Sequence, residues 1–394
     1  MAVRRREWTN RDGSKGSAWQ AGYTDLSGRW RTKSFDLKRD AERYFEETKR
    51  AVRRGTHVAD RDSVTVEEAA EKWMDTCILN ELEKSTLCQY RNHVDNHIVP
   101  AIGSILLTRI TKPVVTDFRD ELLKANSRVH ARKIFNSFKA ILKDAESRGS
   151  INHNPAASVE IGRDVRQQAA DIHTRVFPQP AEIRDIIATA PLPYSRPFLL
   201  TAAFTGLRAS ELRGLHWGNV DFSKRRLHVR HRADRFNVIG PLKSKAAYRS
   251  IPLTPEVESA LREWRVACPR RGGRLVLVFP NRDGGVESHT PLLRGLHSVQ
   301  QRAGIVTPRL GEDGQPLMKN GRAVMIAKYG LHDLRHFFAS WLINELRLTA
   351  KKVQVLLGHS SIKTTLDIYG HLFDDHEGDD AAFAAASDRI LSGR

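Results

Sequence analysis

The sequence predicts a multidomain protein that is mainly α-helical and carries small antiparallel β-sheets. At 394 residues the chain is long for one hydrophobic core, so two or three domains are expected. Stretches with apolar residues at helical spacing fill most of the length, and strand-like runs are few and short. Polar stretches at Arg53–Asp62 and Gly162–Thr174 interrupt this pattern and are predicted linkers.

Residues 1–60 are predicted to form a sheet of three strands packed on one helix. Strand-like runs at Trp19–Tyr23 and Arg29–Phe35 flank a turn at Asp25–Gly28, and a helix is expected from Leu37 to Arg54. This segment carries 15 Lys and Arg against 9 acidic residues. Its basic strands can contact phosphates and base edges in a DNA groove; the alternative is a solvated basic lobe without a specific site.

Residues 63–160 are predicted to be an all-α bundle. Ser63–Glu68 carries a helix-capping signal, because polar residues are followed by acidic ones in the first turn. The last expected helix has a basic face, which is either solvated or contacts phosphates. The further helices are Ser85–His97, Lys112–Ala125 and Arg128–Ser147, with breaks expected at Pro100, Gly103, Pro113 and Gly149.

Residues 177–394 are predicted to be a mainly helical unit with a small antiparallel sheet. Pro180 suits the first turn of a helix, and helices are expected to about residue 217. Residues 307–328 are rich in glycine turns and are predicted to form an extra loop or hairpin. The tail from Asp374 is expected either to dock on a neighbouring protomer or to cap its own domain. The remaining elements are strands at Arg226–His231 and Arg249–Leu253 and helices at Pro255–Val266, Pro291–Ala303 and from Leu331 onward.

The chain carries 64 Lys and Arg against 46 Asp and Glu, a net charge of +18. Such an excess favours polyanionic partners, and nucleic acid is the expected one. A membrane span is not expected, since no apolar run approaches the ~20 residues that it needs. An acidic membrane surface is the rival partner, but the sequence lacks a basic amphipathic helix with aromatic residues on its other face. The cysteines are Cys77, Cys88 and Cys268, which form no CxxC pattern, so a reducing cytoplasm is expected.

Candidate catalytic residues occur in a fixed order in the third unit. Arg208 follows the predicted tight turn Gly206-Leu207 and precedes a helix start, where an anion is favoured. Arg335 lies three residues after His332, so both are expected on one helix face. Two guanidinium groups suit a phosphodiester, because attack on phosphorus builds negative charge on oxygens that the planar fork of arginine can bind.

His332 is expected to accept or donate a proton near a nucleophile, while Asp333 is expected to hold Arg208 or the local backbone. An alternative takes His332 and His336, one helical turn apart, as metal ligands. The metalloprotease pattern needs glutamate directly after the first histidine, and Asp333 stands there instead. No third ligand is evident, so a metal site is not expected.

Tyr369 is the candidate nucleophile. It stands ten residues after His359, which follows the predicted left-handed helix cap Gly358 and is expected to reach a phosphate oxygen. Gly370 and His371 follow the tyrosine directly and predict mobility and a polar setting. With a usual pKa of about 10, the phenol needs help to lose its proton, which nearby arginines and a histidine can supply.

These motifs resemble those of the tyrosine recombinases, the phage-integrase family. They are the runs TGLRASEL from Thr205, HDLRH from His332, GH from Gly358 and TLDIYGH from Thr365. The resemblance covers residues 177–371. It implies an α+β tyrosine-recombinase catalytic domain in residues 177–394, a helical core-binding domain in 63–160 and an arm-type DNA-binding domain in 1–60.

The resemblance also implies a role for each candidate. Tyr369 would attack the scissile phosphate and form a 3′-phosphotyrosyl link, with His332 as acid/base helper. A lysine on a hairpin, here expected over Pro241–Pro252, would protonate the 5′ leaving group; Lys243 is the first choice and Lys245 the second. Because the covalent link conserves the phosphodiester energy, no cofactor, ATP or metal ion is expected. The phosphate would be held by Arg208, Arg335 and His359.

The expected function is therefore site-specific DNA recombination, by an integrase of a phage or other mobile element in the cytoplasm and nucleoid of a bacterial host cell. Family members act as four protomers on two duplexes through a Holliday junction. The expected partners are double-stranded DNA, a homotetramer and an accessory DNA-bending or directionality protein. The alternatives are a type IB-like topoisomerase, which reseals the same strand, and a non-cleaving DNA-binding regulator with the same fold.

Overall fold

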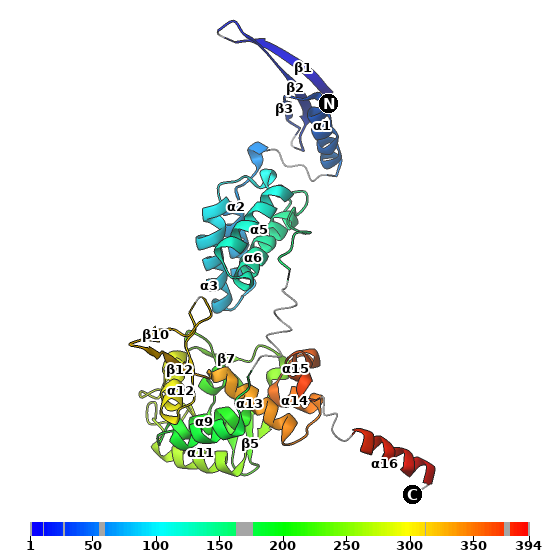
Figure 1. The fold of residues 1–394 in the computed structure, drawn as a ribbon. Coiled ribbons are helices and arrows are strands. Elements are labelled where there is room, and N and C mark those ends of the chain that lie inside the picture. Colours follow the sequence, from blue (N-terminus) through cyan, green and yellow to red (C-terminus); the bar gives the residue numbers. More distant parts are fainter. Residues whose placement is uncertain are drawn as a thin grey trace. The chain divides into compact units, whose positions relative to one another are not determined.

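The computed structural model describes residues 2–10, 12–26, 28–54, 60–162, 176–311, 313–373 and 379–392. The chain divides into two compact units, Met1–Asp164 and Val165–Arg394 (Figure 1). It is mainly helical with small antiparallel sheets, which confirms the predicted fold class. A further boundary near residue 60 stays a prediction. Half of the first predicted linker, at 55–59, most of the second, at 163–174, and the start of the tail at 374–378 lie outside the described residues.

The first unit begins with a three-stranded antiparallel sheet in the order β1-β2-β3, packed on one helix. On the helix side, the rings of Tyr23 and Phe35 lie 6.2 Å and 5.2 Å from the ring of Tyr44. The predicted sheet and helix are confirmed. The elements are β1 (Ala2–Thr9), β2 (Lys15–Thr24), β3 (Trp30–Phe35) and α1 (Lys38–Arg53).

A helical bundle completes the first unit. The predicted capping signal is confirmed at α2, where Thr65 Oγ1 accepts from the N–H of Glu68 at 3.2 Å and the Glu68 carboxylate accepts from the N–H of Thr65 at 2.9 Å. The break predicted at Pro100 is wrong. A π-helical segment directly before it takes up the interruption, because proline lacks the N–H that a continuous α-helix needs. The helices are α2 (Val66–Leu79), α3 (Lys84–His93), η2 (Val94–Ile98), α4 (Val99–Ile102), α5 (Lys112–Ala125) and α6 (Arg128–Ser147).

The second unit is built around two packed helices, α9 (Ser195–Thr205) and α13 (Leu331–Asn344), which Figure 1 shows near its centre. Both are apolar on most faces, and both are covered on most faces. A small sheet of β4 (Val220–Asp221), β5 (Arg226–Val229) and β8 (Arg249–Pro252) packs side chains such as Leu227 and Ile251 into the same core. The further helices are α8 (Pro180–Thr189), α10 (Ala209–Arg213), α11 (Pro255–Ala267), α12 (His289–Ala303), α14 (Ala350–Leu357), α15 (Ile362–Tyr369) and α16 (Asp379–Ser392).

Two predicted hairpins have different outcomes. Residues 307–328 do form paired ribbons, because β9 pairs with β12 and β10 pairs with β11. The hairpin predicted over Pro241–Pro252 is wrong. β7 pairs with β6 and β8 pairs with β5, and a 3₁₀ turn at Lys245–Ala247 separates them. The strands are β4 (Val220–Asp221), β5 (Arg226–Val229), β6 (His231–Ala233), β7 (Ile239–Pro241), β8 (Arg249–Pro252), β9 (Val306–Pro308), β10 (Met318–Lys319), β11 (Arg322–Ala323) and β12 (Met325–Ala327).

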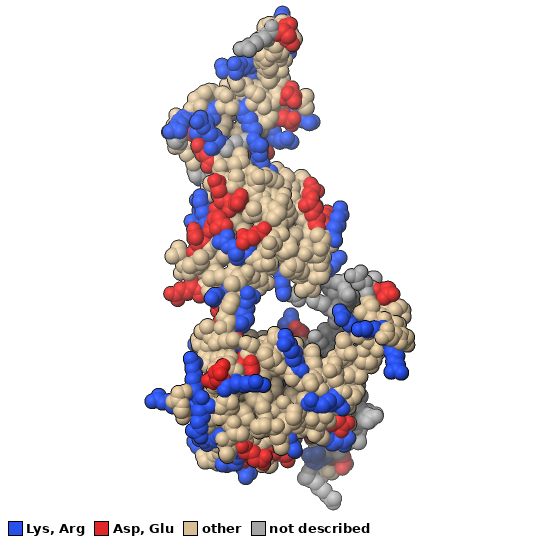
Figure 2. Space-filling view, turned by 90° about the vertical axis from the view of Figure 1, so that its left-hand side faces the viewer, with Lys and Arg blue, Asp and Glu red and all other residues tan. Residues whose placement is uncertain are grey.

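The surface carries both signs of charge. Figure 2 shows Lys and Arg side chains on the visible face of both units, with Asp and Glu between them. Within the described part of the chain, no helix is both long and apolar enough to cross a membrane.

Candidate active site

The turn at Gly206 places Arg208 at the start of a short helix. α9 ends in Gly206, whose φ is +58°, and a Cβ atom there would lie 2.3 Å from the ring of Phe338, so only glycine fits. Arg208 then caps α10, and its N–H donates to the Glu211 carboxylate at 2.9 Å. The Arg208 side chain remains 36% exposed, which leaves its guanidinium accessible to an anion.

The carboxylate of Glu211 joins two arginines beneath this turn. It accepts from Arg208 Nη1 at 2.9 Å and from Arg249 Nη1 and Nη2 at 3.1 Å and 2.8 Å. Arg249 also donates to the carbonyl oxygens of Leu356 at 2.8 Å and Ala247 at 3.0 Å. Burial raises the pKa of Glu211, but the hydrogen bond and charge of Arg249 outweigh burial and hold that pKa below its usual value. The buried ion pair of Glu211 and Arg249 therefore holds the guanidinium of Arg208 in place.

Arg335 ties the Gly206 turn to the end of α14. Its Nη1 donates to the carbonyl of Gly206 at 2.7 Å, and its Nη2 donates to the carbonyl of Leu357 at 2.6 Å. The side chain is fully buried. Burial lowers the pKa of Arg335 to about 9, and the charges of Arg208 and Arg249 add to this effect. The guanidinium is still charged at neutral pH.

His359 lies against the same positive charges. It follows Gly358, which ends α14 in the predicted left-handed conformation with φ +67°. Burial lowers the pKa of His359 to about 4, and the charges of Arg335 and Arg208 add to this, so the ring is neutral at neutral pH. Its Nδ1 lies 2.9 Å from Thr365 Oγ1. When Nδ1 accepts from that hydroxyl, Nε2 carries the hydrogen and can donate to an anionic oxygen.

Tyr369 ends α15 and is only 1% exposed, and the mobility predicted from Gly370 and His371 stays a prediction. Its Oη lies 2.7 Å from Nδ1 of His336, and the ring of Phe177 covers it with a centroid distance of 5.8 Å. His371 does not open the site, because its ring stacks on Phe177 at 5.9 Å. The phenol is not isolated from the arginines, since Tyr369 acts electrostatically on Arg335 and favours its charged form.

The two other predicted members lie nearer the surface. Lys243 follows β7 on an exposed stretch. His332 is exposed in the first turn of α13, and its charge contributes to the lowered pKa of His359. Asp333 accepts from the N–H of Gly330 at 2.7 Å, so it holds the local backbone, one of its two expected roles. Among the residues whose placement is described, no group of three or more His, Cys, Asp or Glu side chains is arranged to hold a metal ion.

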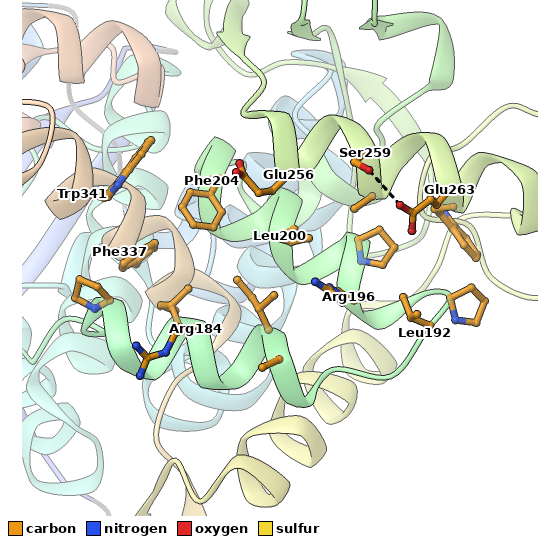
Figure 3. Close-up of a pocket in the computed structure, with 18 of the residues that line it drawn as sticks. Arg184, Leu192, Arg196, Leu200, Phe204, Glu256, Ser259, Glu263, Phe337 and Trp341 are labelled. Atoms are coloured by element: carbon orange, nitrogen blue, oxygen red, sulfur yellow. Dashed lines mark hydrogen bonds between the residues drawn. The ribbon is translucent and has the colours of Figure 1, made fainter.

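A separate groove of about 930 Å³ lies among α8, α9, α11 and α13 (Figure 3). Leu200, Phe204 and Trp341 supply part of its apolar wall, and charged side chains such as Glu256 and Arg196 also line it. None of the predicted catalytic residues lines this groove. It suits an apolar segment better than a phosphodiester.

Sequence patterns do not single out Glu211, Arg249 or His336 as functional residues. Glu211 has a local signal, because an acid three residues after the start of a helix can cap it. Arg249 has none, since its partners are distant in the sequence. The sequence suggests His336 only as a metal ligand, and its contact with Tyr369 is evident only in the structure.

We expect Glu211→Gln to lower the free energy of unfolding by about 3–5 kcal/mol at neutral pH, because Arg249 would stay buried without an opposite charge. The folded-state pKa of Glu211 lies below its usual 4.5, so its stabilisation is complete above that pH and is lost as pH falls through the folded-state value. Urea titrations of both proteins should therefore show a difference that shrinks below about pH 4.5. Exposed Glu345→Gln is the control; a pH-independent difference for Glu211→Gln would contradict the pairing.

Comparison with known proteins shows two matching family models. The model described as the phage integrase family matches residues 177–376, which is just over half of the chain. The model described as the phage integrase N-terminal SAM-like domain matches residues 65–123. The two matches fall in the two predicted units that the motifs and the helical pattern define.

Relatives and solved structures agree with these matches. The chain is 24% identical to a tyrosine recombinase XerC-like protein of Caldanaerobacter subterraneus subsp. tengcongensis, over 88% of this chain and 90% of the relative. It is 25% identical to the ICEBs1 integrase of Bacillus subtilis, over 72% and 73%. The fold is similar to the Tn1549 transposon integrase in complex with transposon right end DNA (TM-score 0.63, 19% identity, 82% of this chain and 100% of that one). It is also similar to a lambda integrase tetramer bound to a Holliday junction (TM-score 0.54, 16% identity, 90% and 95%).

Proposed function

The chain belongs to the phage integrase family and is a tyrosine-type site-specific recombinase, and from this premise we propose that it cuts and rejoins DNA through a 3′-phosphotyrosyl link on Tyr369. We propose that the reaction integrates or excises a phage or other mobile element. The observation that carries the mechanism is the convergence of charge around the Gly206 turn, where Arg335 donates to the Gly206 carbonyl and the Glu211 carboxylate joins Arg208 and Arg249.

The arginines divide the work of holding the phosphate. Arg208 is partly exposed and already fixed by Glu211, so its remaining N–H groups bind a phosphate oxygen directly. Arg335 donates two N–H groups to backbone carbonyls, and its positive charge stabilises the phosphate from the buried side of the Gly206 turn. Neutral His359 donates one further hydrogen bond. These groups are in place before DNA arrives, so little reorganisation is needed as charge develops on the phosphate.

The cleavage step breaks one ester and forms another. Tyr369 gives its phenolic proton to a neighbouring histidine as its Oη bonds to phosphorus, the bond from phosphorus to the 5′ oxygen breaks, and Lys243 gives that oxygen a proton. His332 serves as an acid/base helper near the site. Because Tyr369 is 1% exposed, the phosphate reaches Oη only after Phe177 or the segment that follows Tyr369 moves. A 5′-hydroxyl from the partner duplex then attacks the link and restores the phosphodiester.

We propose the N-terminal sheet as a second DNA contact. Side chains alternate between the two faces of a strand, and Tyr23 faces α1, so the paired register puts Arg4, Arg6 and Trp8 on the opposite face. All three are exposed. A flat face with two guanidinium groups and an aromatic ring suits phosphates and base edges in the major groove.

We propose that four protomers assemble on two duplexes, with the tail of one protomer in the groove of the next. On α16, Ile390 and Leu391 are 82% and 86% exposed, and the groove of Figure 3 is lined mostly by apolar side chains. A head-to-tail contact of this kind forms a closed ring when the rotation closes.

Replacing both Ile390 and Leu391 by Asp should weaken tetramer assembly on DNA by roughly tenfold or more and leave binding of one protomer to one site unchanged. The reason is that two apolar anchors are lost without any change in the DNA-binding residues. Mass photometry of the protein with duplex DNA measures both states. Val266→Asp, on an equally exposed apolar residue of α11, is the matched control. An unchanged tetramer fraction in the double variant would contradict this arrangement.

The test of the proposed function needs no known target site. The full chain is incubated with a pool of nicked duplexes of random sequence, and the DNA that becomes covalently bound is recovered and sequenced. Proteolysis and mass spectrometry should then place the 3′ DNA end on Tyr369. The selected sites should support exchange between two duplexes, whereas a topoisomerase would only relax one supercoiled circle. A link to another residue would refute the assignment of the nucleophile.

A further inference from the structure

The hydroxyl of Tyr369 meets an imidazole that the predicted catalytic set does not use. Its Oη lies 2.7 Å from Nδ1 of His336, the distance of a good hydrogen bond. Both side chains are buried, with exposed fractions of 1% and 3%. His336 follows Arg335 directly on α13 and Tyr369 ends α15, so the elements that carry the buried guanidinium and the phenol meet at this contact.

Aromatic rings enclose the pair. The ring of Phe177 lies 5.5 Å from that of His336 and 5.8 Å from that of Tyr369. Phe177 also stacks on the ring of His371. While these rings enclose the pair, the phenol cannot release its proton directly to bulk water, and the acceptor within hydrogen-bond distance is Nδ1 of His336.

The other basic groups of the site are poorly suited to that task. Arg335 is charged at neutral pH and a guanidinium has no lone pair to offer, so it can stabilise the phenolate but not take the proton. The Nδ1 of His359 lies against the hydroxyl of Thr365 instead. His332 stands on the surface, with its ring edge-on to that of His336 at 4.8 Å.

We propose that His336 is a further catalytic residue, which takes the phenolic proton of Tyr369 during cleavage and returns it during rejoining. With hydrogen on Nε2, its Nδ1 offers a lone pair to the phenol. As Oη bonds to phosphorus, the O–H bond breaks and the proton moves to Nδ1, while the 5′ oxygen leaves with a proton from Lys243. Rejoining reverses both transfers. This inference rests on the proposed function, because it takes Tyr369 as the nucleophile.

Three substitutions separate proton transfer from packing. His336→Asn keeps a hydrogen-bond acceptor close to the position of Nδ1 but cannot take the proton. His336→Ala leaves a cavity that free imidazole can enter, and His336→Phe fills the same space with a ring that has no acceptor. The rate of covalent capture is measured in a single turnover, with the full chain in excess over a nicked duplex recovered from the random pool.

All three variants should form the covalent link about 100-fold or more slowly, within the usual contribution of a positioned general base. Added imidazole should restore at least a tenfold part of that loss in His336→Ala and nothing in His336→Phe. DNA affinity and the melting temperature of His336→Asn should stay close to those of the unmodified chain, which shows that the slow step is chemical.

Two results would overturn the proposal. Unchanged or faster capture in the variants would mean that His336 only holds the phenol in a resting position. Slow capture in His336→Ala that added imidazole does not restore would mean that His336 has only a structural role. Failure of the proposed function is recognised separately, because it appears as a DNA link on a residue other than Tyr369 in the unmodified chain.

Discussion

Tyr369→Phe removes covalent capture of DNA, by about 10⁴-fold or more in rate, and leaves DNA affinity within about twofold. The substitution deletes one oxygen and keeps the ring that packs on Phe177. In this variant Nδ1 of His336 faces a ring that has no hydroxyl, so the hydrogen bond and the nucleophile are lost together. The lost hydrogen bond costs about 1–3 kcal/mol of stability, which a folded domain of this size tolerates.

The measurement is gel detection of the protein–DNA link with nicked duplex, beside a binding titration on intact duplex. Tyr248→Phe is the matched control, because Tyr248 lies on an exposed stretch of the same unit, 42% exposed. It should capture DNA at the unmodified rate. A covalent link that persists in Tyr369→Phe would remove Tyr369 from the mechanism, and with it the role proposed for His336.

Local signals in the sequence predict much of the fold. α5 and α6 begin and end at the predicted residues, and the predicted break at Gly149 follows the end of α6 directly. The end of α14 also lies where it is predicted, because the left-handed cap at Gly358 is a one-residue signal. Where the outcome depends on a distant partner, local patterns fail. Leu227 in β5 pairs with Ile251 in β8, and this pairing rather than a local hairpin decides the path between them.

The site shows the same division. The motifs contain residues that lie close together in the fold, but they do not predict how deeply each side chain is buried. A helical spacing of three places His332 and Arg335 near one face, yet the first is exposed and the second is buried. The reason is that Arg335 reaches carbonyls of Gly206 and Leu357, which are far away in sequence. Buried polar groups require such partners, and only the tertiary structure names them.

Arg335→Lys should lower the rate of covalent capture by about 10²–10³-fold and leave the unit folded. Lysine keeps the positive charge, but its single ammonium group cannot donate to both backbone carbonyls in the fixed geometry of a guanidinium, so the charge beneath the phosphate is displaced. Arg335→Ala should lose more activity and also stability. The carbonyls of Gly206 and Leu357 would each lose a buried donor, at about 1–3 kcal/mol for each. The lysine variant is therefore the informative one for catalysis.

Arg213 provides the matched control for that experiment. It is also a buried arginine of the second unit, and it donates to the carbonyl of Glu287 at 2.6 Å. Arg213→Lys should cost stability similar to Arg335→Lys and capture DNA within a few-fold of the unmodified rate. Thermal unfolding and single-turnover capture of both variants decide the matter. Equal losses of capture in the two variants would mean that Arg335 acts only through packing. A loss confined to Arg335→Lys would mean that the guanidinium of Arg335 places its charge where the phosphate needs it.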